Sequence, residues 1–340
     1  MIKNSTMIKC KNCSLVYSGL LFVILLLSFP AAAQQDNHLS QFYAMPMTLN
    51  PATTGMFDGN YRAHIHYRTQ WASIIKNPFI TQEIAYDAPK NKFGYGGYLM
   101  NTKAGAGSLQ ALSVVLSGSY EITDKDPSNY HHLTSGVQLG FINKSVNISN
   151  LTFDNQYSTA NGGGFDPSIA STESFQKTSS FSPELNFGVY YYNTNLEKKI
   201  KPYIGMSGMH LTTPLESFLQ IKNSMPWKYV AVGGAKIKIN ELLNIEPSIL
   251  FMQQTNVHEI NIGAIGYYYM AGSNAYFLMG AYYRNHDAII LNTGFLYKEY
   301  VLRLSYDVNT SSLFAYSKGR GGFEISITYK KNNKAYAPSF

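Results

Sequence analysis

Alternation with a period of two residues is the feature that most constrains the fold of this chain. In residues 61–71, Tyr, Ala, Ile, Tyr, Thr and Trp alternate with Arg, His, His, Arg and Gln. Residues 300–307 and 323–329 repeat this alternation of apolar and polar positions. Successive side chains of a strand point to opposite faces, so each stretch predicts a β-strand with one apolar and one polar face.

The composition is unusual for a soluble protein. Only 14% of the residues are charged, against about 25% in a typical soluble domain, and the chain holds 27 Tyr and 27 Gly. After residue 33 no apolar run approaches the length of a membrane-spanning helix. This combination favours an all-β transmembrane antiparallel barrel, with aromatic residues near the strand ends. The alternative is a soluble two-sheet sandwich, which alternates in the same way.

We expect about 14 strands, within a range of 12–16, and an even number suits a closed barrel. The short connections alternate with longer ones, such as residues 144–181 and 212–227, which predicts long extracellular loops and short periplasmic turns. The expected strands are 61–71, 80–88, 93–102, 108–121, 131–143, 182–193, 200–211, 228–239, 243–253, 257–269, 274–284, 287–297, 299–308 and 320–331.

The N-terminus reads as a secretory signal peptide at residues 1–33. Lys3 and its neighbouring lysines precede an apolar run at residues 15–29, and three alanines precede Gln34. The alternative is an uncleaved anchor, but the run is shorter than the ~20 residues that a spanning helix needs. We therefore expect export to the outer membrane of a Gram-negative cell. The expected divisions are a signal peptide at 1–33, a plug or periplasmic segment at 34–60, a barrel at 61–331 and a tail at 332–340.

Cleavage of the leader would remove a possible cysteine motif and reduce the net charge of the chain. Cys10 and Cys13 form a C-x-x-C pair, but both lie in the leader, so the remaining chain has no cysteine. The formal charge falls from +7 to +4, because 24 basic and 20 acidic residues remain. The basic balance therefore gives little support to a nucleic-acid partner, and we expect none.

The polar faces of the strands point into the predicted barrel. They carry charges of both signs, which form either a structural network or the lining of a binding cavity, and the structural interpretation is preferred. The residues expected to form this polar lumen network are Arg62, His64, His66, Arg68, Glu83, Asp87, Glu246, Glu259, Arg303, Asp307 and Glu324.

No catalytic, cofactor or metal site emerges from the motifs. His64 and His66 share one strand face, but a metal site needs three or four ligands, so polar lumen lining is the preferred interpretation. The chain contains no G-x-S-x-G elbow, no phosphate-binding loop and no dinucleotide fingerprint. His131–His132 and His286–Asp287 lie near strand ends, where a surface hydrolase would carry its chemistry. We expect no enzymatic activity.

Residues 41–55, QFYAMPMTLNPATTG, are nearly uncharged and broken by two prolines. Such backbone cannot lie in lipid with its polar groups unsatisfied. It therefore lies inside the barrel as a plug or in the periplasm as a docking tail, and we favour the plug. Thr53 would meet the polar lining with Asn50. The residues expected to form the plug are Phe42, Tyr43, Met45, Met47, Asn50 and Pro51.

This segment also carries a resemblance. SQFY at 40–43, LNPA at 49–52 and the YR-x-QW of 67–71 are similar to the start of the PorP/SprF family of the Bacteroidota type IX secretion and gliding machinery. FDNQY (153–157), GMSGMHLTTP (205–214) and GGFEISITYKK (321–331) resemble later landmarks in the same order. The resemblance spans about residues 38–331.

The resemblance implies an outer-membrane barrel without enzymatic activity that assists export or surface anchoring of large proteins with C-terminal sorting domains. The partners that it implies are outer-membrane lipids, those secreted surface proteins and other type IX components. The alternative is a passive channel or transporter for small or apolar solutes. An apolar pocket with a lateral opening would support the channel, and a plugged lumen with a partner site at the outer rim would support the secretion role.

Overall fold

The fold was obtained as a computed structural model. The chain divides into two units, residues 1–34 and 35–340, and every described residue belongs to the second. The predicted signal peptide and the predicted tail lie outside the described residues. No helix among the residues described is long and apolar enough to cross a membrane. The described residues are 36, 38–105, 107–123, 129–159, 163–166, 168–173, 177–214, 218 and 224–331.

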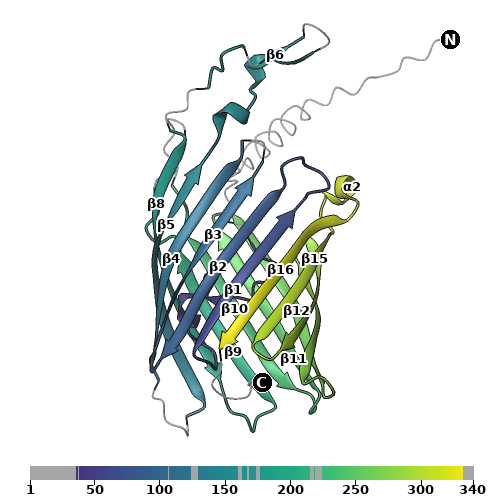
Figure 1. The fold of residues 1–340 in the computed structure, drawn as a ribbon. Helices are drawn as coiled ribbons and strands as arrows, with labels where there is room; N and C mark the ends of the chain where they lie inside the picture. Colours follow the sequence, from purple (N-terminus) through teal and green to yellow (C-terminus); the bar gives the residue numbers. More distant parts are fainter. Residues whose placement is uncertain are drawn as a thin grey trace, which may run out of the picture. The chain divides into compact units, whose positions relative to one another are not determined.

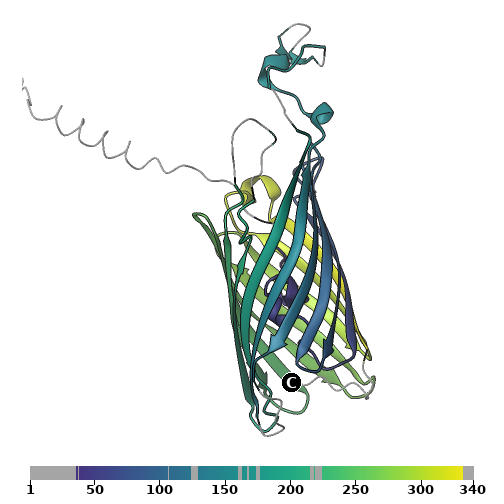
Figure 2. The same cartoon turned by 90° about the vertical axis from the view of Figure 1, so that its left-hand side faces the viewer.

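Fourteen strands form one closed antiparallel barrel (Figures 1 and 2). The barrel closes where β1 pairs with β16, with Tyr61 opposite Lys331. The predicted fold and number of strands are confirmed, and the predicted boundaries agree within three residues. The strands are β1 (Tyr61–Gln70), β2 (Phe79–Lys90), β3 (Phe93–Ala104), β4 (Leu109–Glu121), β5 (His131–Ser145), β8 (Ser179–Asn193), β9 (Ile200–Met209), β10 (Lys228–Lys238), β11 (Leu243–Gln254), β12 (Val257–Met270), β13 (Ala275–Arg284), β14 (Ala288–Tyr297), β15 (Tyr300–Asn309) and β16 (Arg320–Lys331).

Short elements occur in the connections and before β1. The connection between β5 and β8 was expected to hold no strands, but it contains a two-stranded sheet in which Tyr157 pairs with Phe165. The elements are η1 (Pro46–Thr48) and η2 (Pro51–Thr53) before β1, then η3 (Ile148–Asn150), η4 (Asp154–Gln156), β6 (Tyr157–Ser158) and β7 (Gly164–Phe165) between β5 and β8, and α2 (Phe314–Ser317) before β16.

The two ends of the barrel differ in their connections. We call one end the loop end, because it carries the long connections 146–178, 210–227 and 310–319. The other is the short-turn end, with turns such as 91–92 and 298–299. Two connections at the loop end are also short, residues 255–256 and 285–287.

The alternation seen in the sequence becomes the two faces of the barrel wall. In β1 the side chains of Arg62, His64, His66, Arg68 and Gln70 are all buried, facing inward. The outer face is apolar and exposed on strand after strand, a surface that matches the hydrocarbon of a membrane. Its large exposed side chains include Ile65, Ile84, Leu116, Leu139, Ile204, Ile262, Met279 and Leu291.

Candidate functional site

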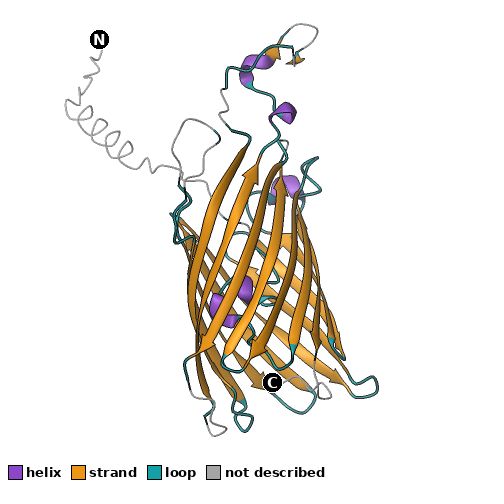
Figure 3. Ribbon diagram, turned by 60° about the vertical axis from the view of Figure 1, so that its left-hand side comes forward, coloured by secondary structure: helices purple, strands orange, loops and turns teal. Residues whose placement is uncertain are grey.

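The inside of the barrel is occupied by the chain's own N-terminal residues. We call residues 38–56 the lumen segment; Figure 3 shows its two short helices within the ring of strands. Pro46 and Pro51 each open a 3-10 helix, where the absent proline N–H is not needed. The Asn50 side chain accepts a hydrogen bond from Ala52 N and so caps η2. The prolines thus break the segment into tight turns that fit a narrow interior.

The lumen segment runs along the barrel from one end to the other. Near the loop end, Asp36 N donates to Gln254 Oε1 at the end of β11 (2.8 Å). At the short-turn end, Asn60 N donates to Lys331 O at the end of β16 (2.7 Å). The residues between these points therefore pass through the lumen before β1 begins.

Glu324 of β16 is the main anchor of the segment. Its two carboxylate oxygens accept hydrogen bonds from the backbone N–H groups of Ser40 (2.6 Å) and Gln41 (2.9 Å). The same carboxylate forms an ion pair with Arg68, which lies directly opposite in the strand register, and contacts His66 Nε2 (3.1 Å). A fully buried charge is thus satisfied partly by the wall and partly by the segment, as a buried carboxylate requires.

Ser40 joins a second part of this network. Its hydroxyl donates to Asp307 Oδ2 (2.8 Å) and accepts from Arg68 Nη1 (2.7 Å) and Arg284 Nη1 (3.0 Å). Arg284 also donates to Asp307 Oδ2 (2.8 Å). Two arginines, two carboxylates and one serine from the segment therefore form one buried cluster in the half of the barrel nearer the loop end.

Further along, the wall supplies donors for the carbonyl groups of the irregular backbone. This matters because buried backbone groups need partners that a 3-10 turn alone does not provide. Four side chains of β4, β5 and β9 donate to it: Gln138 to Met47 O (2.8 Å), Ser207 to Leu49 O (2.5 Å), Thr134 to Ala52 O (2.9 Å) and Ser119 to Thr54 O (2.7 Å).

Two inward-facing glycines let the segment come close to the wall. A Cβ at Gly136 would overlap the backbone of Pro51 and Ala52, and one at Gly188 would overlap the Asn50 side chain. Asn50 Nδ2 donates to Val189 O (3.0 Å) and Met206 O (3.2 Å), on β8 and β9. Glycine is needed at such points because any side chain would push the segment away.

The apolar residues of the segment pack in two groups. Phe42 belongs to a buried cluster with Met209, Leu250 and Tyr282, and its ring meets the Tyr282 ring edge-on at 5.3 Å. Tyr43 stacks on Tyr282 at 5.7 Å, and its hydroxyl donates to Asn292 Oδ1 (2.9 Å). The second group comprises Met45, Met47, Ala85, Tyr98 and Val115.

The residues expected to form the plug therefore all lie in the lumen segment: Phe42, Tyr43, Met45, Met47, Asn50 and Pro51. Thr53 differs from expectation, since its hydroxyl donates to Asn50 O within the segment (2.8 Å). The adjacent Thr54 makes the contact with the wall, at 2.5 Å from Ser117 Oγ.

The polar residues predicted for the lumen all lie on the inner face, and the strand register pairs several of them. Arg62 and Asp87 face each other across β1 and β2 and form a two-point ion pair (2.9 and 2.7 Å). Others contact uncharged hydroxyl groups of the wall: His64 and Arg303 contact Thr328 (2.9 and 3.1 Å), and Glu246 accepts from Tyr203 and Tyr267. Glu259 contacts His38 of the lumen segment (3.2 Å).

Glu83 is the exception among them. It lies opposite His66 in the register, yet neither of its carboxylate oxygens has a hydrogen-bond partner within the described part of the chain. His64 and His66 have rings 5.7 Å apart and separate partners on β16. Among the described residues, no three His, Cys, Asp or Glu side chains are placed to hold a metal ion.

The histidines considered for a hydrolase lie at the two barrel ends. His132, at the short-turn end, contacts Glu121 through Nδ1 and Thr194 Oγ1 through Nε2 (2.9 Å). His286 lies at the loop end, where Asp287 is engaged by Arg284 Nε (2.6 Å). Glu121, His132 and Thr194 link a carboxylate, an imidazole and a hydroxyl, but the hydroxyl belongs to a threonine in an exposed turn.

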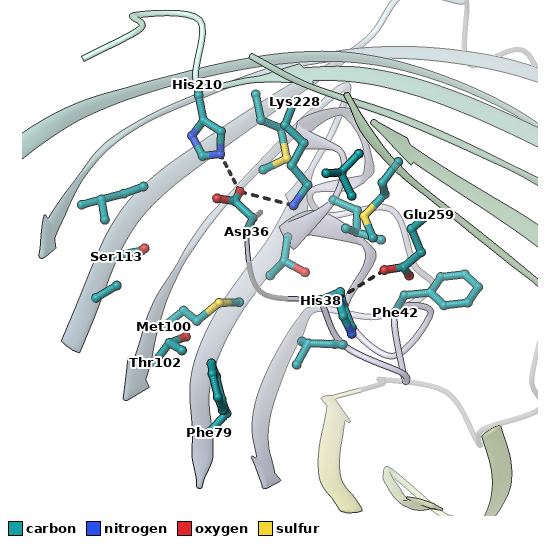
Figure 4. Close-up of a pocket in the computed structure, with 18 of the residues that line it drawn as sticks. Asp36, His38, Phe42, Phe79, Met100, Thr102, Ser113, His210, Lys228 and Glu259 are labelled. Carbon is teal, nitrogen blue, oxygen red and sulfur yellow. Dashed lines mark hydrogen bonds and ion pairs between the residues drawn. The ribbon is translucent and has the colours of Figure 1, made fainter. Parts of the chain in front are cut away.

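Sequence reasoning missed a charged cluster at the loop end, of which Figure 4 shows Asp36, His210 and Lys228. His210 lies between Asp36 (Nε2 to Oδ2, 2.6 Å) and Glu184 (Nδ1 to Oε2, 2.8 Å), and Lys228 reaches Asp36 Oδ2 at 3.4 Å. We call Asp36, Glu184, His210 and Lys228 the loop-end cluster. Alternation along β8 would have placed Glu184 inside, but no pattern marks Asp36 or His210.

The charges of the loop-end cluster shift the pKa values of His210 and Asp36. Burial alone would lower the pKa of His210, but Asp36 and Glu184 raise it to about 9. Burial would raise the pKa of Asp36, but Lys228 and His210 hold it well below its usual range. The imidazolium and the carboxylate are therefore both charged at neutral pH. Together they tie the start of the described chain to β8, β10 and the residue after β9.

The lumen segment separates two cavities. The loop-end cavity has a volume of about 580 Å³ and is lined by Asp36, Phe42 and Leu49 among others. The short-turn cavity has a volume of about 950 Å³ and is lined by Tyr43, Pro46 and other residues. The two have no described lining residue in common. The segment thus contributes to both cavities and lies between them.

Comparison with known proteins identified one matching family and several solved structures of similar fold. The model of a family described as "Type IX secretion system membrane protein PorP/SprF" matches residues 31–329. No curated protein matches the sequence.

Among solved structures, the chain is similar to three barrels at low identity. The CymD monoaromatic hydrocarbon channel is 15% identical, with 85% of this chain and 93% of that chain covered and a TM-score of 0.48. The toluene transporter TbuX of Ralstonia pickettii is 13% identical, with 84% and 92% covered and a TM-score of 0.49. The translocator domain of the autotransporter NalP from Neisseria meningitidis is 9% identical, with 86% and 95% covered and a TM-score of 0.41. At these values the likeness carries no information on function.

Proposed function

Because this chain belongs to the PorP/SprF family of type IX secretion system membrane proteins, we propose that it is an outer-membrane barrel that assists export or surface anchoring of large proteins with C-terminal sorting domains. The match over residues 31–329 carries this proposal. The signal peptide expected at residues 1–33 would direct the chain to the outer membrane. Other components of the type IX system are its proposed partners there.

The filled lumen supports a partner-binding role. A conducting channel needs a continuous path, whereas here the lumen segment lies between two cavities that share no described lining residue. The segment is held by buried charges on β1, β15 and β16 and by hydrogen bonds with β4, β5, β8 and β9. In this proposal residues 38–56 act as a plug that keeps the barrel closed to solutes while partners bind at its ends.

The loop end is the proposed site of cargo contact. The connection between β5 and β8 is the longest of the barrel, and β6 and β7 lie within it, beyond the ends of β5 and β8 (Figure 1). Tyr157 and Phe165 are about half exposed, at 53% and 51%, and their rings meet edge-on at 5.5 Å. Exposed aromatic pairs of this kind are typical anchors of protein interfaces.

A second candidate function is passive passage of small or apolar solutes. The observation that favours it is the loop-end cavity, whose lining includes the apolar side chains of Met100, Leu250 and Met252. Passage would require the lumen segment to move, because the segment separates this cavity from the one at the short-turn end.

The test is a comparison of the surface and medium proteomes of a deletion strain with those of its parent. The proposal predicts loss of a defined set of proteins with C-terminal sorting domains, with normal uptake of small solutes. Complementation with Tyr157→Ala/Phe165→Ala should fail to restore that set, while the control Tyr316→Ala, at a residue 75% exposed in α2, should restore it. An unchanged set of secreted proteins, together with failure to take up a solute, would favour the channel.

A further inference from the structure

The short-turn cavity gathers cationic side chains from five strands, in addition to Lys92 in the turn between β2 and β3. Lys201 of β9, Lys236 of β10, Arg303 of β15, Lys330 of β16 and Arg62 of β1 all line it. The strand register puts Lys201 directly opposite Lys236 and Arg62 directly opposite Lys330. Directly opposite side chains on one sheet face are close neighbours, and like charges in that arrangement are destabilising.

Most of these cations lack a counter-charge from the barrel itself. Asp87 neutralises Arg62 through two hydrogen bonds. Within the described chain, the side chains of Lys201, Lys236 and Lys330 make no ion pair or hydrogen bond, although Lys201 is only 5% exposed. Arg303 donates one hydrogen bond to Thr328, but its buried Nε has no partner in the described residues.

The carboxylates of the cavity do not remove this excess. Glu246 accepts hydrogen bonds from Tyr203 (3.1 Å) and Tyr267 (3.3 Å), and Glu121 is engaged by His132. The remaining two, Asp58 and Glu197, are exposed residues outside the strands; Asp58 attracts Lys201 and Lys330 but forms no ion pair with either. Among the described residues, Lys201, Lys236, Arg303 and Lys330 therefore form no ion pair, while the buried carboxylates of Glu246 and Glu121 are already engaged.

We propose that the short-turn cavity is a binding site for an oxyanion ligand, a phosphate or carboxylate compound with at least two negative charges, which Lys201, Lys236, Arg303 and Lys330 hold from opposite sides. Burying a cation without a partner costs free energy. A wall that brings the Lys201–Lys236 pair, Arg303 and Lys330 to one cavity recovers that cost when a multivalent anion bridges them. This inference goes beyond the proposed secretion role and does not depend on it.

The uncharged lining fits a ligand larger than a simple ion. The volume of about 950 Å³ lies within the range of small-molecule pockets, about 300–1,000 Å³. Tyr190 and Tyr203 form a stacked pair of rings (6.0 Å apart, 15° between planes) in the lining. Aromatic faces next to cations can hold the body of a ligand while the cations hold its charged groups.

The test is titration of the purified full-length barrel in detergent with two probes, pyrophosphate and citrate, followed by calorimetry at low and high salt. We expect saturable one-to-one binding of at least one probe, which weakens as salt screens the charges. Pyrophosphate alone would assign a phosphate ligand, and citrate alone a carboxylate ligand. Failure of both probes to bind would overturn the proposal.

Three variants make the test specific. Lys201→Met/Lys236→Met should weaken binding about tenfold or more without loss of the folded barrel, since it removes a repulsive pair. Lys201→Arg/Lys236→Arg should retain binding, because it keeps both charges. The control Lys103→Met, at an exposed residue of β3, should bind like the parent protein. Unchanged affinity in the methionine variant, or loss of binding in a folded arginine variant, would show that these charges do not hold the ligand.

Discussion

Removal of the Asn50 side chain is the most direct test of how the lumen segment is held. The side chain makes three hydrogen bonds: one from Ala52 N (3.0 Å), and one each to Val189 O (3.0 Å) and Met206 O (3.2 Å). Each is worth about 1 kcal/mol net. Asn50→Ala should therefore destabilise the bound state of the segment by about 3 kcal/mol, which corresponds to an opening equilibrium about a hundredfold larger.

Hydrogen exchange measured by mass spectrometry reads this equilibrium directly, because protected amides exchange at a rate set by local opening. The amides of Thr48, Leu49 and Thr53 are hydrogen-bonded within the segment and report on it. We expect a peptide covering residues 44–56 to exchange about a hundredfold faster in Asn50→Ala, with the strand peptides unchanged.

The matched control is Asn147→Ala. Asn147 caps η3 in the same way, accepting from Ser149 N (3.1 Å), but it lies in the connection after β5, and its side chain makes no hydrogen bond across the barrel to any described residue. Its removal should accelerate exchange only around residues 147–150, by about fivefold for a single lost cap of about 1 kcal/mol. Equal exchange of residues 44–56 in Asn50→Ala and the parent protein would refute the argument that these cross-barrel bonds hold the segment.

Three further predictions concern the same segment. Gly136→Val should displace it, because the added side chain overlaps Pro51 and Ala52, whereas the outward-facing Gly118→Ala should leave protease resistance of residues 38–56 unchanged. Glu324→Gln should lower the free energy of urea unfolding by about 3 kcal/mol, because it removes one of the two buried carboxylates that pair with Arg68; a loss below about 1 kcal/mol, the value of a surface pair, would contradict this. The pKa of His210 is raised to about 9, so its charged imidazole contributes about 3 kcal/mol to the free energy of unfolding. This contribution is fully present below pH 6.5 and is lost as the pH rises through about 9. The melting temperature of the parent protein should therefore exceed that of His210→Gln at pH 6 but not above pH 9, and a difference independent of pH would count against the role of His210.

The strands and their inner faces could be predicted because a period of two is a strong local signal. Arg62 and Arg68 alternate with apolar neighbours, and the closed barrel buries them both. The start of β8 was harder to predict from the sequence. It begins at Ser179 rather than 182, because β5 extends to Ser145 and pairs with Ser179. Pro183 is tolerated inside this strand, since pairing with β9 begins only at Phe187.

Only part of the candidate site could be predicted from the strand pattern. Strand register explains the pairing of Arg62 with Asp87 and of Arg68 with Glu324, since each pair lies directly opposite. The contacts of Ser40 depend on the path of an irregular segment. Such a segment has no periodic pattern of apolar and polar residues, so the sequence does not indicate which residues it contacts. The sequence therefore left two places for residues 41–55, the lumen and the periplasm.

The position of the lumen segment also bears on how the barrel is completed. Its anchors come from both ends of the barrel sequence, with Arg68 on β1 and Asp307 and Glu324 on β15 and β16. These strands meet only when β1 pairs with β16, the last strand of the barrel. Before that closure the buried carboxylate of Glu324 would lack both Arg68 and the backbone N–H groups of the segment. Seating of the segment and closure of the barrel therefore stabilise each other, because each supplies the charges or donors that the other leaves unsatisfied.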